Sequence, residues 1–410
     1  MKILVITQYF HPEPFRINDL VLGLRQRGHR VEILTGMPNY PSGRFYAGYS
    51  AFGPWTDDFH GMPVHRVPLM RRGERKNWRL AANYISFALS ACALGPLRCR
   101  GAYDVIFVYE PSPVTVALPG IVLRKLKQAP MLFWVQDLWP ESLSATGAVR
   151  SRWLLRLVRR LVDFIYRRCD RVLVSSTGFT GHVAASGIAA ERIVNVPNWA
   201  ENAYRPLDNP PPEILTELPA GFRVMFAGNI GSAQAFDTIL AAAEKLRDRT
   251  DIQWVILGDG MLKSWVAEEV RRRGLERQFH LLGHRPLESM AAYFSAADAL
   301  LVTLRDTPAF ALTVPSKVQS YLACGRPIIA AINGEGADLV SAAGAGLTCP
   351  AENADRLAQT VVELCNMPQQ QRTAMGHNGR AYFEANFERE LVIDRIERLM
   401  LAATEKTCAS

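Results

Sequence analysis

Short runs of apolar residues recur along the chain, and segments of helical length separate them. The runs are apolar almost throughout, as parallel strands covered on both faces are. They span residues 3–7, 30–36, 64–68, 104–109, 131–137, 171–176, 192–198, 223–229, 253–260, 279–283, 299–304 and 327–332. Such alternation of strands and helices predicts an α/β fold of right-handed β-α-β units in doubly wound sheets.

The alternation breaks once, in the proline- and asparagine-rich stretch NWAENAYRPLDNPPPEILTELPAG. This composition is typical of a linker, and 410 residues suit two domains. We predict an N-terminal Rossmann-like domain over 1–203, a linker over 204–221 and a C-terminal domain over 222–384. A last helix, at about 385–410, is expected to pack back on the first domain. Two such domains facing a cleft bind ligands at the carboxyl ends of their strands.

Composition indicates a globular protein, since 49% of the residues are apolar and 21% are charged. The seven cysteines show no metal-like spacing and favour reduced thiols in the cytoplasm. The net charge of +8 is unevenly distributed: residues 1–200 hold 26 Lys and Arg against 13 Asp and Glu, and the remainder holds 21 against 26. The basic N-terminal half is compatible with an anionic membrane surface or with nucleic acid.

Two segments of this half raise the question of a membrane. Residues 80–97 carry no charge and have basic flanks, yet they are barely long enough to span and include polar residues. We interpret them as a buried or interfacial helix. Residues 151–169 form a basic amphipathic helix, which suits an anionic membrane surface or, equally, a core-facing helix with a solvated back.

A glycine turn follows the first strand of the second half. Gly228, Asn229 and Gly231 stand between that strand and a helix, where backbone N–H groups close on an anion. An ordinary tight turn would have the same composition. The site, if it is one, lies in the predicted cleft.

The stretch VPSKVQSYLACG places Lys317 in the first turn of a helix, where the helix dipole disfavours cations. A guest with more negative charge than the helix end can neutralise would explain the lysine. Lys317 and Arg305 would then meet a diphosphate beside the glycine turn. The alternative is a solvated lysine.

In the first half, polar residues follow two strands. Gln136, Asp137 and Glu141 stand beside two tryptophans and suggest a sugar-binding wall, although Asp137 would also cap the next helix. The loop after the first strand offers Glu13, Arg16 and Asn18 to the same cleft.

Several motifs together resemble one known family. The run LGDGMLKSWVAEEVRRRGLERQFHLLGHRPLESMAAYFSAADALLVTL and the run YLACGRPIIA resemble the donor-binding domain of family 4 retaining glycosyltransferases, which have the GT-B fold. The runs QYFHPEPFRINDLVLGLRQRGHRVEILTGMPNYPSG, VQDLWPESLSATG and VPNWAE resemble a bacterial subgroup that builds capsule and O-antigen, with fucosamine and colanic-acid-type transferases.

The resemblance implies retaining, metal-independent transfer of a sugar from a UDP-linked donor to a lipid-linked or glycan acceptor. The sugar would be an N-acetylated deoxyhexosamine such as FucNAc, and no cofactor is expected. The protein would be cytoplasmic and peripheral at the inner face of the cell membrane, through its basic half.

The chain departs from the family pattern at charged positions. Leu312 and Ser320 stand where many members carry a Glu pair, and Asn229 and Gln234 stand near the phosphate-binding Arg and Lys. Lys317 would therefore supply the positive charge that Asn229 and Gln234 lack. Gln136 corresponds to a His of the family's first domain.

The candidate residues fall into three groups. Lys317, Gln136 and Asp137 are the catalytic candidates. The donor-binding candidates are Gly228, Asn229, Gly231, Gln234, Arg285, Arg305, Pro315, Ser316, Ser320 and Glu335. The acceptor or cleft candidates are Glu13, Arg16, Asn18 and Glu141, and no metal site is expected. Two rival functions remain open at this point, a UDP-sugar epimerase of the same fold and a basic nucleic-acid-binding protein.

Overall fold

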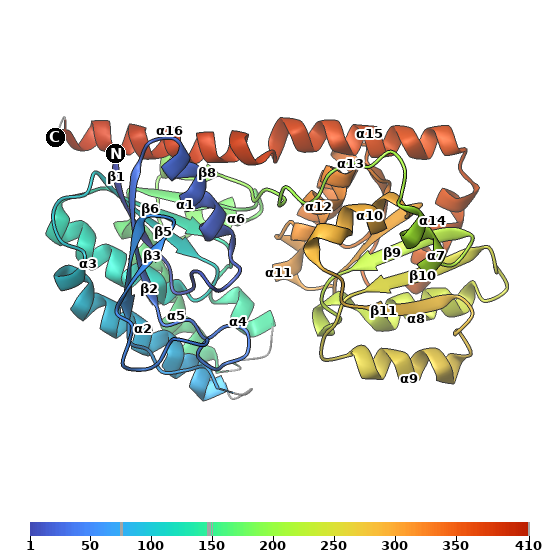
Figure 1. The fold of residues 1–410 in the computed structure, drawn as a ribbon, viewed down its shortest axis with the longest axis horizontal. Coiled ribbons are helices and arrows are strands. Elements are labelled where there is room, and N and C mark those ends of the chain that lie inside the picture. The colour runs from blue at the N-terminus through green and yellow to red at the C-terminus, as the bar shows by residue number, and fades with distance from the viewer. Residues whose placement is uncertain (74–76, 146–148, 150, 409–410) are drawn as a thin grey trace. The chain divides into compact units, whose positions relative to one another are not determined.

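The computed structural model describes residues 1–73, 77–145, 149 and 151–408, which form two compact units (Figure 1). Unit 1 contains Met1–Val196 and the residues from Ile393 on, and unit 2 contains Pro197–Val392. Residues 197–203, which the sequence analysis assigns to the first domain, fall in unit 2. The reason is packing, because Ala200 and Tyr204 join the core of that unit.

Unit 1 is built on an eight-stranded sheet in the order β3-β4-β2-β1-β5-β6-β7-β8. Its strands are β1 (Lys2–Ile6), β2 (Arg30–Gly36), β3 (Thr56–Phe59), β4 (Met62–Val67), β5 (Val105–Glu110), β6 (Met131–Val135), β7 (Arg171–Val174) and β8 (Ile193–Asn195). Neighbouring strands pair in parallel, except that β3 runs antiparallel to β4 at one edge.

The helices of unit 1 connect and cover these strands (Figure 1). They are α1 (Arg16–Gln26), α2 (Asn77–Arg98), η1 (Val114–Val116), α3 (Ala117–Lys127), α4 (Glu141–Ala145), α5 (Arg152–Arg168), α6 (Phe179–Ala184) and η2 (Ala190–Arg192). The last helix, α16 (Arg389–Cys408), also contributes to this unit. Glu397 of α16 accepts hydrogen bonds from Arg27 at 2.6 Å and pairs with His29 at 2.7 Å.

Unit 2 is built on a six-stranded, fully parallel sheet in the order β11-β10-β9-β12-β13-β14. Its strands are β9 (Phe222–Ala227), β10 (Ile252–Leu257), β11 (Phe279–Gly283), β12 (Ala299–Thr303), β13 (Ile328–Ala331) and β14 (Gly346–Cys349). Its helices are α7 (Pro212–Glu217), η3 (Ser232–Gln234), α8 (Phe236–Lys245), α9 (Lys263–Arg273), η4 (Leu287–Ser289), α10 (Met290–Ser295), α11 (Pro308–Ala311), α12 (Ser316–Cys324), α13 (Glu335–Ala342), α14 (Ala354–Asn366) and α15 (Gln369–Asn386).

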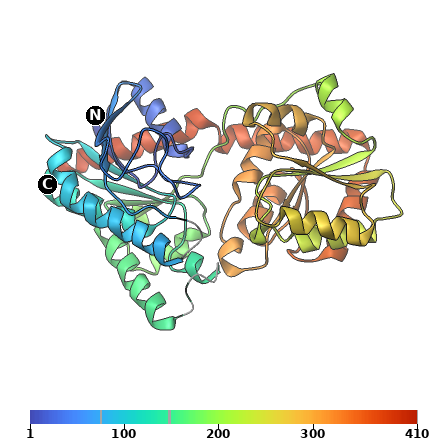
Figure 2. The same ribbon diagram turned by 60° about the horizontal axis from the view of Figure 1, so that its bottom comes forward.

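The strands of unit 2 are apolar because both faces of the sheet are covered by helices (Figure 2). Met225, Val255 and Leu300 pack into a core on one face. Val224, Phe226 and Trp254 pack into a second core on the other face. Adjacent residues of one strand therefore serve opposite cores, which explains the runs without polar alternation. The two sheets confirm the predicted pair of doubly wound, Rossmann-like folds.

Each sheet has a point where the strand order reverses. In unit 1 the chain leaves β1 for β2 and later returns to β5 on the other side of β1. In unit 2 it leaves β9 for β10 and later returns to β12 on the other side of β9. Ligands of doubly wound sheets bind at the carboxyl ends of the strands at such reversals. The fold therefore directs attention to the segments after β1 and β5, and to those after β9 and β12.

Candidate functional site

The turn after β9 lies at the strand reversal of unit 2 and packs backbone against backbone on the turn after β10. Gly228 has φ +132°, a conformation that residues with a Cβ rarely adopt. Its N–H donates to the Leu257 carbonyl at 2.8 Å, and the Ile230 N–H donates to the Asp259 carbonyl at 2.8 Å. The N–H groups of Asn229 and Ser232 have no partner within the described residues. These two donors are open to an anion.

Lys317 reaches this turn from α12, far along the chain. A Cβ on Gly228 would lie 2.7 Å from Lys317 Cε and 3.1 Å from its Nζ, so the glycine leaves the space that the lysine fills. The Lys317 ammonium lies 4.3 Å from the centre of the Phe226 ring. It has no ion pair or hydrogen bond within the described part of the chain. The structure therefore brings an unpaired cation to the glycine turn.

The surroundings of Lys317 also change its titration. Burial lowers the pKa of the Lys317 amine to about 8, because the charged form loses hydration. The first turn of α12 adds open donors, since its N-cap residue Pro315 makes no side-chain cap bond. A bound anion would compensate the lost hydration of the Lys317 ammonium. It would also accept hydrogen bonds from the open N–H groups at the start of α12.

The remaining donor candidates near α12 lie at its start. A Cβ on Gly336 would lie 2.9 Å from Pro315 Cδ, so α13, which begins at Glu335, packs beside the start of α12. Ser316 is the first residue of α12, and Ser320 is buried one turn later, where its hydroxyl donates to the Ser316 carbonyl at 3.2 Å. Gln234 closes the glycine turn by accepting the Gly231 N–H at 3.2 Å.

Two arginines expected at the donor site are paired with carboxylates instead. Arg305 lies 3.2 Å from Asp237 and 2.6 Å from Glu352, and it donates to the Ser232 carbonyl at 3.0 Å. Arg285 forms an ion pair with Glu217 and donates to the Leu282 carbonyl at 2.6 Å. Their contact with a phosphate stays a prediction, and the structure adds that carboxylates already hold both guanidinium groups. Arg305 holds the glycine turn in place.

Three acceptor candidates of unit 1 hold loops or helices together. Buried Glu13 accepts the N–H groups of Phe10, Asn39 and Tyr40 at 3.1, 2.8 and 2.7 Å, and burial raises its pKa to about 7. Asn18 accepts the His11 N–H at 3.1 Å. A ligand contact of these two side chains stays a prediction, and the structure shows that their polar atoms also form hydrogen bonds within the loop.

The third of these candidates is Glu141, which accepts from Arg159 at 2.9 Å and so ties α4 to α5. Its role as a ligand contact stays a prediction. Arg16 begins α1 and is partly exposed, next to the loop that Glu13 and Asn18 organise.

The carboxyl ends of β5 and β6 bring two acidic residues together. Asp137 follows β6, and burial raises its pKa to about 6. Glu110 ends β5, is fully buried, and accepts the backbone N–H groups of Gln136 and Asp137 at 3.4 and 3.5 Å. Burial and the neighbouring Asp137 charge raise the pKa of Glu110 well above its usual range. Glu110 was not among the candidates, although an acid that ends an apolar strand is a usable signal.

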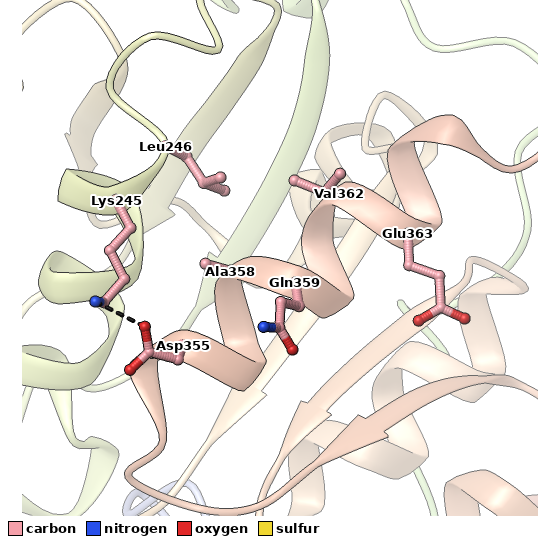
Figure 3. Close-up of a pocket in the computed structure, with 7 residues that line it drawn as sticks. All are labelled: Lys245, Leu246, Asp355, Ala358, Gln359, Val362 and Glu363. Atoms are coloured by element: carbon pink, nitrogen blue, oxygen red, sulfur yellow. Dashed lines mark ion pairs between the residues drawn. The ribbon is translucent and has the colours of Figure 1, made fainter.

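Two surface hollows lie away from these strand ends. One, of about 500 Å³, is lined by Leu246 and Val362, with the Lys245–Asp355 ion pair at its rim (Figure 3). The other, of about 410 Å³, lies at the amino ends of β1 and β2, near Lys2 and Arg30. Neither borders the glycine turn, Lys317 or Asp137. Among the described residues, no group of three His, Cys, Asp or Glu side chains is arranged to hold a metal ion.

One helix of unit 1 is apolar on its exposed face. Trp78, Ile85, Leu89 and Leu97 of α2 are 60, 54, 66 and 65% exposed. Trp78–Arg98 is long and apolar enough to cross a membrane by length and composition, with 28% of its most apolar window buried. Its inner face is anchored, since buried Asn83 accepts from the Gln8 amide at 2.7 Å and donates to the Met70 carbonyl at 2.6 Å.

Comparison with known families agrees with this architecture. Residues 221–367 match the family model described as glycosyl transferases group 1. Residues 15–199 match the model described as glycosyl transferase 4-like domain. The two Rossmann-like units and the solved structural neighbours show the GT-B fold of glycosyltransferases. The chain belongs to the family 4, group 1 glycosyltransferases.

Curated relatives and solved structures extend the comparison. The chain is 26% identical over 338 residues to WcaI of Escherichia coli, named as a colanic acid biosynthesis glycosyl transferase, covering 79% of this chain and 82% of WcaI. It is 27% identical over 308 residues to the glycosyltransferase WbjE of Pseudomonas aeruginosa, covering 73% and 74%. HepE of Anabaena, solved in complex with UDP, superposes with a TM-score of 0.68 at 17% identity, covering 98% and 100%. Sucrose-phosphate synthase of Thermosynechococcus elongatus gives 0.73 at 18% identity, covering 100% of both.

Proposed function

We propose that this glycosyltransferase moves a sugar from a UDP-linked donor to a lipid-linked or glycan acceptor during surface polysaccharide synthesis of the capsule or O-antigen kind. The observation that carries the proposal is the unpaired Lys317 ammonium at the glycine turn of the unit 2 strand reversal. The name of WcaI supports a role in polysaccharide synthesis. The complex of HepE with UDP supports UDP as the nucleotide of the donor. The proposed sugar is an N-acetylated deoxyhexosamine such as FucNAc.

The proposed role of the donor site follows from the charge that develops on the leaving group. Breaking the bond between the sugar and the diphosphate places negative charge on the leaving phosphate. Lys317, the N–H groups of Asn229 and Ser232, and the first turn of α12 would stabilise that charge without a metal ion. Fixed donors of this kind need no reorganisation during the reaction, which is why they accelerate it.

Asp137 and Gln136 are the proposed residues of the acceptor side. The Asp137 carboxylate has no hydrogen bond within the described residues, and its raised pKa of about 6 leaves it ionised at neutral pH. A carboxylate with such a pKa is suited to accept the proton of an acceptor hydroxyl. Transfer with retention at the anomeric carbon is proposed on the family resemblance.

A transfer assay tests the proposed function. Radiolabelled UDP-N-acetylhexosamines would be incubated with the purified chain, with and without a lipid extract of bacterial membranes. We expect label in the organic phase only when protein and lipid are both present. Release of an altered UDP-sugar without lipid would support the epimerase instead. Salt-dependent DNA binding tighter than about 1 µM, with no transfer, would support a nucleic-acid-binding protein.

Donor binding is expected to depend on pH through Lys317. The amine is a cation below its pKa of about 8 and neutral above it, so UDP affinity should fall as the pH rises from 7.5 to 9. The phosphate of UDP stays fully ionised in this window, since its second pKa is about 6. Calorimetric titration at several pH values measures the effect. The Lys317→Met variant should show a flat profile, and an equal slope in both proteins would contradict the assignment.

We also propose that the chain is cytoplasmic and docks on the anionic inner face of the cell membrane through α2 and α5. Both helices pack on α3 in unit 1. The outward residues of α2 form an apolar stripe from Trp78 to Leu97. On α5, exposed Trp153 and Leu157 alternate with exposed arginines. An apolar stripe with adjacent cations is suited to insertion at the level of lipid headgroups, with no need to span.

Vesicle flotation tests this docking. Placing a charge on the stripe by Leu89→Glu should reduce binding to phosphatidylglycerol vesicles about tenfold or more, because a buried leucine contributes about 1.5–3 kcal/mol. Leu391→Glu on α16 is the matched control, since Leu391 is 46% exposed outside this stripe. The proposal would be contradicted if the parent and Leu89→Glu bound vesicles equally, or if binding of the parent did not depend on anionic lipid.

A further inference from the structure

The strand reversal of unit 1 carries a polar cluster in which Asp137 is the one residue that was a candidate from the sequence. Tyr9 follows β1, Ser112 follows β5, and Asp137 follows β6, so all three lie at the carboxyl ends of neighbouring strands. Tyr84 enters from α2, and its hydroxyl lies close enough to the Tyr9 hydroxyl and to Ser112 to affect its pKa. Arg72 enters from the loop before α2. This cluster is called the Arg72 site below.

Arg72 is held in place by aromatic rings and has no carboxylate partner among the residues that the structure describes. Its Nη1 donates to the Tyr9 hydroxyl at 3.1 Å, and its backbone N–H donates to the Asn39 side-chain oxygen at 3.1 Å. Its guanidinium lies 5.7 Å from the centre of the Tyr9 ring and 5.1 Å from that of Tyr40. Within the described residues, Arg72 forms no ion pair, so its remaining N–H groups are available to an anion.

The Arg72 site combines a cation, Arg72, with a carboxylate, Asp137, and the charges of both act on Tyr84. Asp137 has no hydrogen-bond partner within the described residues, and the nearby Trp139 Nε1 is a buried donor that is also without one. A ligand that fits this arrangement has a negative group for the arginine and a hydroxyl for the carboxylate.

We propose that Arg72, supported by Tyr9 and Tyr84, binds a phosphate group of the acceptor and so positions the acceptor hydroxyl at Asp137. The inference rests on the proposed transferase function and names the acceptor as a phosphorylated lipid. A guanidinium held on aromatic faces presents its donors in a fixed fork, which matches two oxygens of one phosphate. We assign to Arg72 the acceptor contact expected of Glu13 and Asn18, whose polar atoms form hydrogen bonds within the loop.

The test uses farnesyl diphosphate as the probe, with the full chain and a calorimetric titration. Saturable binding to the parent is expected. Arg72→Ala should weaken it about tenfold to a hundredfold, the range for a lost hydrogen bond to a charged group. Arg71→Ala is the matched control, because it removes the same charge from an exposed neighbour. Equal losses in the two variants, or no binding to the parent, would overturn the proposal.

Four further measurements show whether the phosphate that Arg72 binds belongs to the acceptor, to a lipid headgroup or to UDP. Arg72→Ala should bind phosphatidylglycerol vesicles as the parent does, whereas an equal loss there would assign Arg72 to lipid headgroups and overturn the proposal. It should also keep the parent's affinity for UDP and its melting temperature. Lys317→Met should bind farnesyl diphosphate as the parent does. If the parent does not bind UDP, that result contradicts the proposed transferase function only. The role of Arg72 is tested separately, by the titration with farnesyl diphosphate.

Discussion

Lys317→Met is expected to weaken UDP binding about tenfold and to lower kcat about a hundredfold, the magnitude found when one preorganised donor to a developing negative charge is removed. Methionine keeps the apolar stem that packs over Phe226, where the ammonium lies 4.3 Å from the ring centre. The variant therefore removes the charge and little else. Calorimetric titration and initial-rate kinetics measure the two effects.

Stability separates this charge effect from misfolding. An ammonium without a partner in a desolvated position opposes folding, and the lowered pKa of Lys317, about 8, records that cost. The melting temperature of Lys317→Met should therefore equal or exceed that of the parent. Lys245→Met, which removes an exposed lysine paired with Asp355, should change neither UDP affinity nor kcat. UDP affinity unchanged in Lys317→Met would remove Lys317 from the donor site.

Gly228→Ala is expected to weaken UDP binding about as strongly, by a steric route. The new Cβ would lie 2.7 Å from Lys317 Cε, and the φ of +132° is unfavourable for alanine. The lysine would have to leave the turn, or the turn would have to change shape and carry its N–H groups with it. Backbone strain of this kind costs about 1–3 kcal/mol, so the melting temperature should also fall.

A second glycine provides the control for backbone strain alone. Gly274 caps α9 at φ +66°, and nothing lies within 4 Å of its Cβ position. Gly274→Ala should therefore lower the melting temperature and leave UDP affinity unchanged. If Gly228→Ala bound UDP as the parent does, the contact between the turn and Lys317 would not matter for the donor.

Most of the fold follows from the pattern of apolar runs, because parallel strands covered on both faces must be apolar throughout. Two strands lie outside that pattern. The edge strand β3 reads TDDF and pairs only with β4, so Thr56 and Asp58 are exposed, while Asp57 pairs with buried Arg66. The edge strand β14 reads GLTC and is only four residues long. Edge strands are short and polar for a physical reason, since apolar edges promote aggregation, and this removes the signal.

The candidate site was predictable where it depends on backbone geometry. A glycine turn after a buried strand and a lysine at a helix start gave Gly228 and Lys317, and the fold brings them together. The ion-pair partners of the arginines could not be predicted, because they are distant in the sequence. Arg305 pairs with Glu352, 47 residues away, and Arg285 pairs with Glu217, 68 residues away. An arginine in a sequence does not show which carboxylate will neutralise it.

The residues that the sequence missed share a different feature. Arg72 has no motif around it, and the only signal of Glu110 is its place at the end of an apolar strand. Both contact residues on other elements. Glu110 meets the backbone of residues 136 and 137, and Arg72 meets Tyr9. Only the strand order, which puts β5 between β1 and β6, places those neighbours together.

Unit 2 is proposed to bind a nucleoside diphosphate at the glycine turn and Lys317. The most direct measurement is a calorimetric titration of the purified parent chain with UDP, GDP and dTDP, each repeated on Lys317→Met. The account predicts saturable binding of UDP that exceeds that of GDP and dTDP and weakens about tenfold in the variant. Absence of binding to all three nucleotides would contradict it, and so would UDP binding of equal strength in parent and variant.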